Sequence, residues 1–285
     1  MSTYMRGRLM SIYVDFAHAV EASIRHLQSG GVPVRVERWQ GHETKGDPSL
    51  ETIELLNLNF SVPLYRDVVY QFDDPLPEAH ELLSKALALE IEPNYEWADE
   101  HFLERVGGKP LNPDPSYVRW PWWRGQESSK QAGEKFTHTY SERFWPRYAR
   151  RSGFEPLKGI RYEYGDLQDV LELLTKEPYT RQAYLPIFFP EDTGSIHRGR
   201  IPCTLGYQFL MRDDLLHMWY HIRSCDAIRH FRDDLYLAVK LQLWVLNQLQ
   251  LREPFWQGVK PGSLFFTAYS FHYHRGDEHH LRAKA

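Results

Sequence analysis

The chain has 285 residues, of which 42% are apolar and 25% are charged, so it can bury the core of one large domain and is not a disordered or fibrous protein. Lys and Arg total 34 and Asp and Glu total 38, which leaves a formal charge of -4 and no overall basic surface that could grip a polyanion. We therefore expect a single domain over residues 1–285 and do not expect nucleic acid as a general partner.

The first half of the chain is predicted to open with an amphipathic helix, because apolar residues recur at helical spacing up to the pair Gly30 and Gly31. Alternating apolar residues then predict two short strands around a polar loop, and prolines interrupt the pattern around two later helical stretches. In chain order, these expected elements are a helix at 8–28, strands at 34–36 and 53–55 around the loop 41–49, and helices at 78–89 and 95–106.

The second half of the chain has clearer signals. Two strands are expected within 201–224, hinged at residues 212–214, and a later helix carries apolar residues on nearly all faces, which predicts that it is buried. The expected elements here are a helix at 166–174, a strand at 182–189, the two hinged strands, the buried helix at 234–249 and an aromatic strand at 263–273.

An aromatic segment between these halves has two interpretations. The stretch from Tyr117 to Arg124 interleaves three tryptophans with two arginines, a pattern that could stack a flat ligand or a base. Packing beneath a proline-rich loop explains the same residues equally well. The polar stretch 126–135 that follows is typical of a surface loop.

The two cysteines, Cys203 and Cys225, cannot form a disulfide framework, and this favours a reducing compartment. The sequence has no run of about 18 apolar residues, and its start lacks the apolar stretch and cleavage site of a signal peptide. We expect a cytoplasmic protein that does not cross a membrane.

The hinged strands bring a cysteine and an arginine together. If their turn is centred on Asp213, antiparallel pairing sets Cys203 opposite Arg223, at roughly 4.5–5.5 Å. A guanidinium at that range favours the thiolate, which is the nucleophilic form of cysteine. The alternative is a buried, inert Cys203 beside a surface ion pair, and a slip of one residue would replace Arg223 by Ser224.

Motifs around this pair resemble the thymidylate synthase superfamily. The nucleophile of that family follows a proline, as in Pro202-Cys203, and its later strand carries Arg-Ser-x-Asp, as in Arg223–Asp226. The stretch Glu177–Arg181 is similar to the family's phosphate-binding segment, and Phe271–His274 is similar to its sugar-binding strand. The resemblance covers residues 136–280 well and the first half of the chain only weakly.

Within that superfamily, the chain is most similar to the deoxycytidylate hydroxymethylases of T-even phages. Thr204 follows the cysteine where thymidylate synthases have histidine, and Asp234 stands at the base-reading position where they have asparagine. A carboxylate can only accept hydrogen bonds, so Asp234 suits the exocyclic amine of cytosine, whereas an amide suits uracil. The alternative is that Asp233 and Asp234 only cap the following helix.

The resemblance implies a fold of the α/β class, more strictly α+β, in which helices pack on a large mixed sheet. It implies a 5-hydroxymethyltransferase for dCMP or CMP, with 5,10-methylenetetrahydrofolate as the one-carbon cofactor. Cys203 would add to carbon 6 of the pyrimidine and make carbon 5 nucleophilic toward the one-carbon unit, and water would complete the hydroxymethyl group. The alternatives are a pyrimidine nucleotide methylase and a catalytically silent relative that binds nucleotides or RNA.

The same resemblance assigns roles to individual positions. They are Cys203, Tyr140, Asp234 and Glu100 (or Glu104) in catalysis, Arg181, Arg223 and Ser224 at the phosphate, His272 and His274 at the sugar, and Asp226 at the folate. Arg181 would come from the second subunit of a homodimer. Gln182 and His230 depart from the family pattern, at the phosphate and beside the folate. A metal site at His272-x-His274 is the weaker interpretation, because spacing places no third ligand.

Overall fold

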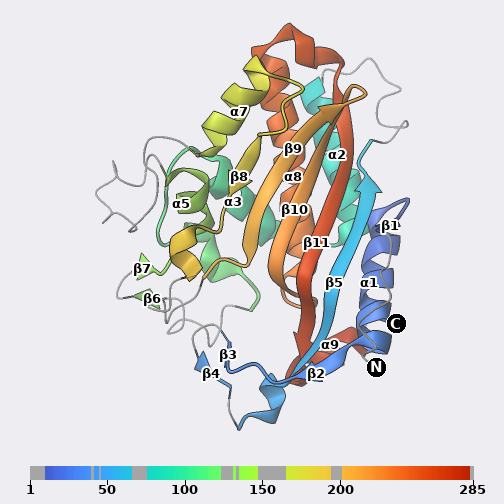
Figure 1. Cartoon of the computed structure of the whole chain (residues 1–285), viewed down its shortest axis with the longest axis vertical. Coiled ribbons are helices and arrows are strands. Elements are labelled where there is room, and N and C mark those ends of the chain that lie inside the picture. Colours follow the sequence, from blue (N-terminus) through green and yellow to red (C-terminus); the bar gives the residue numbers. More distant parts are fainter. Residues whose placement is uncertain are drawn as a thin grey trace.

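The structure in Figure 1 is a computed structural model, and it describes residues 10–39, 42–44, 46–65, 76–122, 131–132, 135–146, 165–193 and 201–282. Its strands are β1 (Ser11–Ile12), β2 (Val32–Val34), β3 (Arg38–Trp39), β4 (His42–Glu43), β5 (Thr52–Pro63), β6 (Gln131–Ala132), β7 (Lys135–Phe136), β8 (Tyr184–Pro186), β9 (Thr204–Arg212), β10 (Leu215–Asp226) and β11 (Lys260–His274). Its α-helices are α1 (Phe16–Gly30), α2 (Leu76–Ile91), α3 (Tyr95–Val106), α5 (Tyr140–Phe144), α7 (Leu167–Lys176), α8 (Phe231–Arg252) and α9 (Glu278–Arg282). Its 3-10 helices are η1 (Pro48–Leu50), η2 (Pro115–Arg119), η3 (Pro190–Thr193), η4 (Pro254–Gly258) and η5 (Arg275–Asp277).

One mixed sheet organises the chain. Its strand order is β1-β5-β11-β10-β9-β8, and β2 pairs with β5 beside this path. β1 runs parallel to β5 and β10 runs parallel to β11, whereas the other pairs of this sheet are antiparallel. The sheet thus brings strands from the first 63 residues next to strands from the last third of the chain. The predicted large mixed sheet is confirmed.

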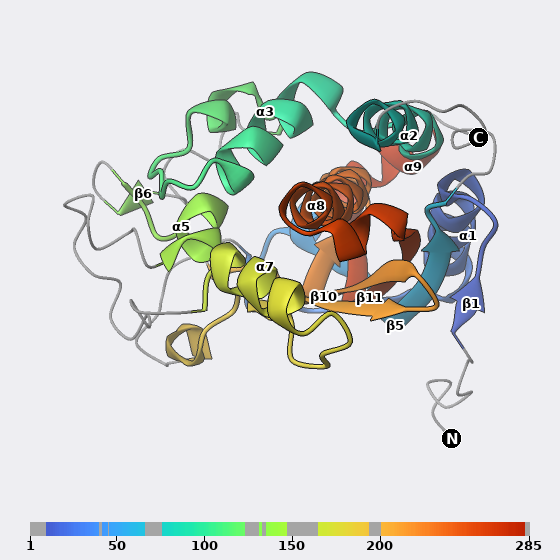
Figure 2. The ribbon, with the colours of Figure 1, turned by 90° about the horizontal axis from the view of Figure 1, so that it is seen from above.

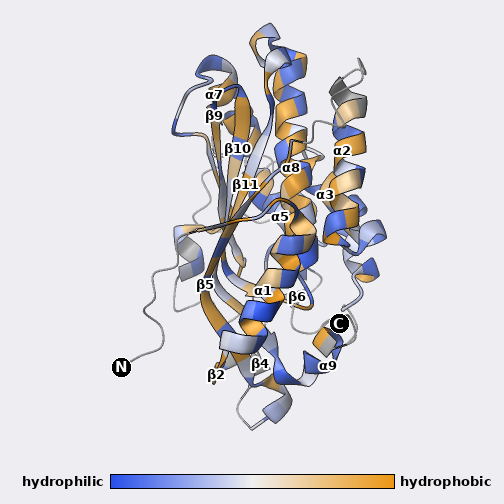
Figure 3. Cartoon of the chain, turned by 90° about the vertical axis from the view of Figure 1, so that its right-hand side faces the viewer, coloured by the Kyte–Doolittle hydropathy of each residue, from blue (hydrophilic) through white to orange (hydrophobic). Residues whose placement is uncertain are grey.

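Helices cover one face of this sheet, as Figures 2 and 3 show from two directions. α8 lies against the sheet, and α2 and α3 pack on α8 from the far side. α8 carries buried residues on nearly all of its faces, which confirms the predicted buried helix. Across β10 and β11, no described α-helix lies on the opposite face. Among the described residues, no helix is long and apolar enough to cross a lipid bilayer.

Most predicted elements are confirmed within a few residues, and α3 has the predicted bounds. The strand predicted at 53–55 was too short, since β5 extends to Pro63. The prediction was wrong at the first helix, which begins at Phe16. Asp15 caps that helix by accepting a hydrogen bond from His18 N, and the residues just before it form β1. The strand predicted at 182–189 was also too long. It is reduced to β8, because the N–H groups of Ile187 and Phe188 both donate to the carbonyl of Leu205, which interrupts the regular pairing with β9.

The hairpin of β9 and β10 positions the predicted nucleophile. Asp213 and Asp214 form a two-residue turn with φ angles of 52° and 56°. The register then shifts at a bulge just after His221. Beyond the bulge, the N–H of Arg223 donates to the carbonyl of Cys203 at 2.8 Å. The predicted pairing of these two residues is therefore confirmed along the backbone.

Candidate active site

A pocket of about 90 Å³ lies where the start of β9 and the end of β10 face α3, η2 and α5. Four of the residues that the family resemblance assigns to the site line it: Cys203, Tyr140, Ser224 and Asp234. The other lining residues are Trp97, His101, Arg105, Asp114, Tyr117, Trp120, Phe136, His138, Thr139 and His230. The pocket therefore joins the C-terminal half of the chain, where the motifs lie, to the middle of the chain, where the sequence pattern was least clear.

Cys203 lies directly before β9 and is partly exposed. The guanidinium of Arg223 donates to the carbonyl oxygens of Pro202, at 2.8 Å, and Ile201, at 3.2 Å. Arg223 thus holds the segment that carries the cysteine, and it is not among the residues that line the pocket. Its predicted contact with a phosphate stays a prediction.

A chain of buried hydroxyl groups leads from one of the predicted catalytic residues toward another. The hydroxyl of Tyr140 lies 3.1 Å from Thr204 Oγ1, which lies 3.0 Å from the hydroxyl of Tyr220. Tyr220 in turn lies within electrostatic range of Asp234. Burial, followed by the charges of Cys203 and Asp234, raises the pKa of Tyr140. The hydrogen-bonded chain thus connects Tyr140 with Tyr220, beside Asp234, through hydroxyl groups alone.

The two adjacent aspartates of α8 have different partners. Asp233 accepts hydrogen bonds from Asn94, from the backbone N–H at 2.7 Å and from the side-chain amide at 2.8 Å. Asp234 lines the pocket, where burial raises its pKa to about 7 although the charge of Arg105 opposes the shift. The N-cap of α8 is His230. Asp234 is thus available to a ligand in the pocket, whereas Asp233 holds the start of α3.

α3 adds a polar face that the family resemblance did not assign. Trp97, His101 and Arg105 follow one another at intervals of four residues, which places them on one side of the helix. Arg105 is buried, with its guanidinium carbon 4.1 Å from the centre of the Tyr140 ring and Nη2 3.1 Å from His101 Nε2. It gives the pocket a positive charge that can stabilise negative charge on a bound base. The spacing on α3 was the signal that could have found it.

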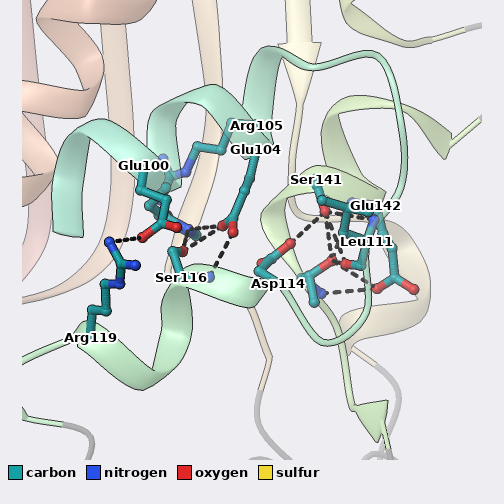
Figure 4. A network of polar contacts seen from close by, with 11 residues as sticks. Glu100, Glu104, Arg105, Leu111, Asp114, Ser116, Arg119, Ser141 and Glu142 are labelled. Carbon is teal, nitrogen blue, oxygen red and sulfur yellow. Dashed lines mark hydrogen bonds and ion pairs between the residues drawn. The ribbon is translucent and has the colours of Figure 1, made fainter. Parts of the chain in front are cut away.

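The two glutamates considered as general acid do not line the pocket. In Figure 4, Glu100 points toward Arg119, with 3.2 Å between the charged atoms. Glu104 accepts from the backbone N–H of Ser116 at 2.6 Å and lies 3.2 Å from His101 Nδ1. Although burial raises the pKa of Glu104, these hydrogen bonds outweigh burial and lower the pKa below its usual value. The assignment of a general acid to α3 stays a prediction.

Asp114 is a carboxyl group that does line the pocket on this side. Its Oδ1 accepts a hydrogen bond from Ser141 Oγ at 2.6 Å, which Figure 4 shows. Burial is the largest influence on its pKa and raises it to about 7. A carboxyl group with such a pKa can donate a proton near neutral pH. Asp114 stands between two prolines, and no pattern in the sequence singled it out.

The aromatic segment forms part of the pocket wall. Trp120 is buried, and its ring stacks on His230 with 4.7 Å between the ring centres. Trp97 lies 6.3 Å from Trp120 by the same measure. Trp123 and Arg124 lie outside the described residues. In the described part, Trp120 packs against the protein and also lines the pocket, and the stacking of a flat ligand on this segment stays a prediction.

The other predicted site residues lie away from the pocket lining. Arg181 is exposed. Asp226, His272 and His274 form a separate buried cluster, in which one oxygen or nitrogen atom of each side chain lies within 4.8 Å of the others. Their predicted roles at the sugar and the folate stay predictions.

Comparisons with known proteins bear on the fold. A scan against protein-family models finds no match, and a search of curated protein sequences finds no significant relative. Among solved structures, the chain is similar to thermostable thymidylate synthase A from Bacillus subtilis, with a TM-score of 0.62 and 13% sequence identity, and the likeness covers 95% of this chain and 83% of that chain. The chain has the thymidylate synthase fold. At this identity the likeness concerns the fold alone, so any assignment of chemistry depends on the residues of the pocket.

Proposed function

We propose that the protein is a pyrimidine nucleotide 5-hydroxymethyltransferase that acts on dCMP or CMP. The observation that carries this proposal is that Cys203, Tyr140 and Asp234 meet in one pocket of a thymidylate synthase fold. The reaction needs a nucleophile, a group that accepts a proton and a group that recognises the base. These three side chains are of the types that can meet those needs.

Asp234 supports cytosine as the base. As a carboxylate it accepts a hydrogen bond from the exocyclic amine of cytosine, whereas uracil offers a carbonyl oxygen at the same position. Two acceptors facing each other in a buried pocket leave both without a donor. Arg105 lines the same pocket and can donate to the acceptors on the ring. The polar groups of the pocket therefore favour a base with an amine at carbon 4.

The proposed reaction begins when the thiolate of Cys203 adds to carbon 6 of the base, which makes carbon 5 a nucleophile. Carbon 5 would then bond to the one-carbon unit, and its proton would leave toward Tyr140. Tetrahydrofolate would depart with the electrons of its bond to that unit, which would leave a methylene group on carbon 5. The hydroxyl chain through Thr204 carries that proton on toward Asp234. Water adds to the methylene group on carbon 5, and departure of Cys203 from carbon 6 restores the aromatic ring.

We infer that 5,10-methylenetetrahydrofolate supplies the one-carbon unit. The side of the pocket formed by Trp97, Trp120 and His230 is aromatic, and such a wall fits a planar pteridine ring. Asp226, predicted to contact the folate, lies outside this lining, and its Oδ1 accepts hydrogen bonds from two backbone N–H groups. The aromatic wall is therefore the feature that supports this cofactor.

We also infer a homodimer that forms through the sheet face opposite the helices. Met218 and Tyr220 point into the core, so Trp219 between them points to the opposite face, where it stacks on Phe265 with 4.1 Å between the ring centres. Half-buried aromatic side chains on a sheet face that no described helix covers are typical of a surface that another copy covers. Arg181, which is exposed, is proposed to reach the phosphate of the neighbouring subunit.

The nucleotide's phosphate and sugar are proposed to bind at the end of β10 and β11. Ser224 lines the pocket at this end and can donate its hydroxyl to a phosphate oxygen. Arg223 and Arg181 are proposed to add charge at the phosphate, and His272 and His274 are proposed to contact the sugar hydroxyls.

The deciding experiment measures release of the carbon 5 hydrogen to water from dCMP, CMP, dUMP and UMP in the presence of 5,10-methylenetetrahydrofolate. We expect release from a cytidine nucleotide, and mass spectrometry should identify a 5-hydroxymethyl product. A 5-methyl product would support the methylase alternative, and binding without release would support a silent relative. Cys203→Ala should abolish release and retain nucleotide binding, and turnover by this variant would rule out the covalent mechanism.

A further inference from the structure

Three buried side chains converge where β10 and β11 end. Asp226 closes β10 and is the register partner of His272 on β11, and His274 follows two residues later on the same face of that strand. Their exposed fractions are 7%, 8% and 2%. One oxygen or nitrogen atom of each side chain lies within 4.8 Å of the other two. The spacing in the sequence indicated only the two histidines as possible metal ligands. The parallel register of β10 and β11 places the carboxylate of Asp226 beside them as a third.

Each of these side chains is held in place by a further group, as metal ligands are in proteins. His272 Nδ1 lies 3.3 Å from Ser270 Oγ, and His274 Nδ1 lies 3.4 Å from Thr52 Oγ1. When Nδ1 donates to such a hydroxyl, Nε2 offers its lone pair to a cation. Asp226 Oδ1 accepts from two backbone N–H groups of the following turn, each at 2.9 Å, which fixes the orientation of its carboxylate.

The charges around the cluster are compatible with a cation. Arg229 lies 3.9 Å from Asp226 Oδ2, but its guanidinium also lies 2.7 Å from Asp277, which balances its charge. Glu54 on β5 is the register partner of His272 on the other side of β11. Arg223 lies within electrostatic range of His272 and donates to backbone carbonyls. The carboxylates of Asp226, Glu54 and Asp277 outnumber the guanidiniums of Arg229 and Arg223. The surroundings of the cluster therefore carry no net positive charge that would repel a divalent cation.

We propose that Asp226, His272 and His274 bind a divalent transition-metal ion, with zinc as the first candidate. Two imidazoles and one carboxylate suit zinc, and the same set binds iron in other proteins. The site is distinct from the pocket that contains Cys203, whose lining includes none of the three residues. The proposal does not rest on the proposed activity, since a metal here needs only the three ligands. A metal bound by His272 and His274 would replace their proposed contacts with the sugar hydroxyls, so these two roles exclude each other.

The position of the cluster suggests what the metal does. Asp226 begins the turn that leads into α8, and its carbonyl accepts from the N–H of His230, the N-cap of that helix. Asp234 lies in the first turn of the same helix. A cation that joins Asp226 to β11 would therefore hold the start of the helix that presents Asp234 to the pocket. Metal binding should raise the melting temperature of the protein.

A second group of possible ligands, His101, Glu104 and Asp114, also lies within 4.8 Å and carries no such proposal. His101 Nδ1 lies 3.2 Å from Glu104 and 3.1 Å from Ser116, and its Nε2 lies 3.1 Å from the guanidinium of Arg105. Both nitrogens of this ring are engaged, and a cation there would lie beside a positive charge.

The test uses protein without an affinity tag, stripped with a chelator, dialysed and reloaded with Zn²⁺ or Co²⁺. We expect about one metal ion per chain by elemental analysis, the visible absorption bands of protein-bound Co²⁺, and a higher melting temperature with metal. Asp226→Asn keeps the acceptor for the two backbone N–H groups and loses the charged ligand, so it should weaken metal binding at least tenfold. His272→Gln should do the same, and circular dichroism would verify that both variants fold.

The matched control is His80→Gln, which removes a buried histidine on α2 outside the cluster and should leave metal binding unchanged. Folded wild-type protein that takes up no zinc or cobalt would overturn the proposal. So would uptake that Asp226→Asn and His272→Gln leave as strong as in the wild type. Because no nucleotide is present, these results are independent of hydrogen release from carbon 5, and either proposal can fail while the other stands.

Discussion

Ionisation of Asp234 is expected to make the base preference of the enzyme depend on pH. Burial raises the pKa of this carboxyl group to about 7. Below that pH the group is protonated and can donate as well as accept, as an amide does, so it can pair with the carbonyl of uracil. Above that pH it only accepts and suits the amine of cytosine. The preference for dCMP over dUMP should therefore rise as the pH increases through about 7.

The size of the effect follows from one hydrogen bond in a buried site. A buried acceptor left without a donor costs about 1–3 kcal/mol, which is roughly fivefold to 150-fold in kcat/KM. Asp234 lies in a site enclosed enough for that cost to apply, because desolvation is the largest influence on its pKa. We expect the ratio of kcat/KM for dCMP to that for dUMP to change by a factor in this range.

The assay is hydrogen release from carbon 5 with both nucleotides, between about pH 6 and about pH 8, on either side of the pKa. Asp234→Asn should improve use of dUMP, weaken use of dCMP and remove the pH dependence of their ratio. Asp233→Asn is the matched control, since Asp233 binds Asn94 and does not line the pocket. It should keep the wild-type ratio at each pH. A ratio that is independent of pH in the wild type, or identical in Asp234→Asn, would refute the role of Asp234.

Further predictions concern stability, proton transfer and assembly. Burial holds the pKa of Asp114 at about 7, above its unfolded value of 3.8, so wild-type stability is lost as the pH rises through that range. Asp114→Asn should therefore raise the free energy of unfolding at pH 8 by up to roughly 4 kcal/mol and have little effect below about pH 4, which urea denaturation can measure. Thr204→Val breaks the hydroxyl chain from Tyr140 and should slow hydrogen release roughly tenfold or more with unchanged nucleotide affinity; equal rates would exclude the relay. Trp219→Glu should shift sedimentation from dimer to monomer, whereas Leu89→Glu, at an exposed apolar position on α2, should not; a dimer in both variants would place the interface elsewhere.

Elements with local signals could be predicted from the sequence. The hairpin was predictable because alternation marks both strands and two aspartates form the turn between them. The bulge after His221 has no such signal, yet it is the shift that brings Arg223 opposite Cys203. The predicted turn centre was about half a residue early, and the bulge compensated for that error. The pairing of Cys203 with Arg223 was therefore predicted correctly because two errors cancelled: the misplaced turn centre and the unpredicted bulge.

Contacts between distant segments could not be predicted in the same way. β10 and β11 were each expected as strands, but the parallel register that places Asp226 beside His272 joins strands that α8 separates in the sequence. The wall of the pocket near Asp114 comes from a proline-rich stretch without periodicity. Family resemblance was weakest there, so the residues it assigned to that side of the site were the least secure.

The carboxyl groups of this region show why residue type alone does not assign an acid or a base. Asp114 and Asp234 line the pocket, and burial raises the pKa of each to about 7. Asp226 is also buried, but His272 and the backbone N–H groups outweigh burial and lower its pKa. The hydrogen bonds of Glu104 also outweigh burial and lower its pKa. The surroundings of each carboxyl group, which depend on the tertiary fold, therefore set its protonation. Asp114 and Asp234 can gain or lose a proton near neutral pH, whereas Asp226 and Glu104 stay ionised. A proton donor for the pocket should therefore be sought at Asp114 as well as on α3, and a comparison of Asp114→Asn with Glu100→Gln in the hydrogen-release assay distinguishes the two positions.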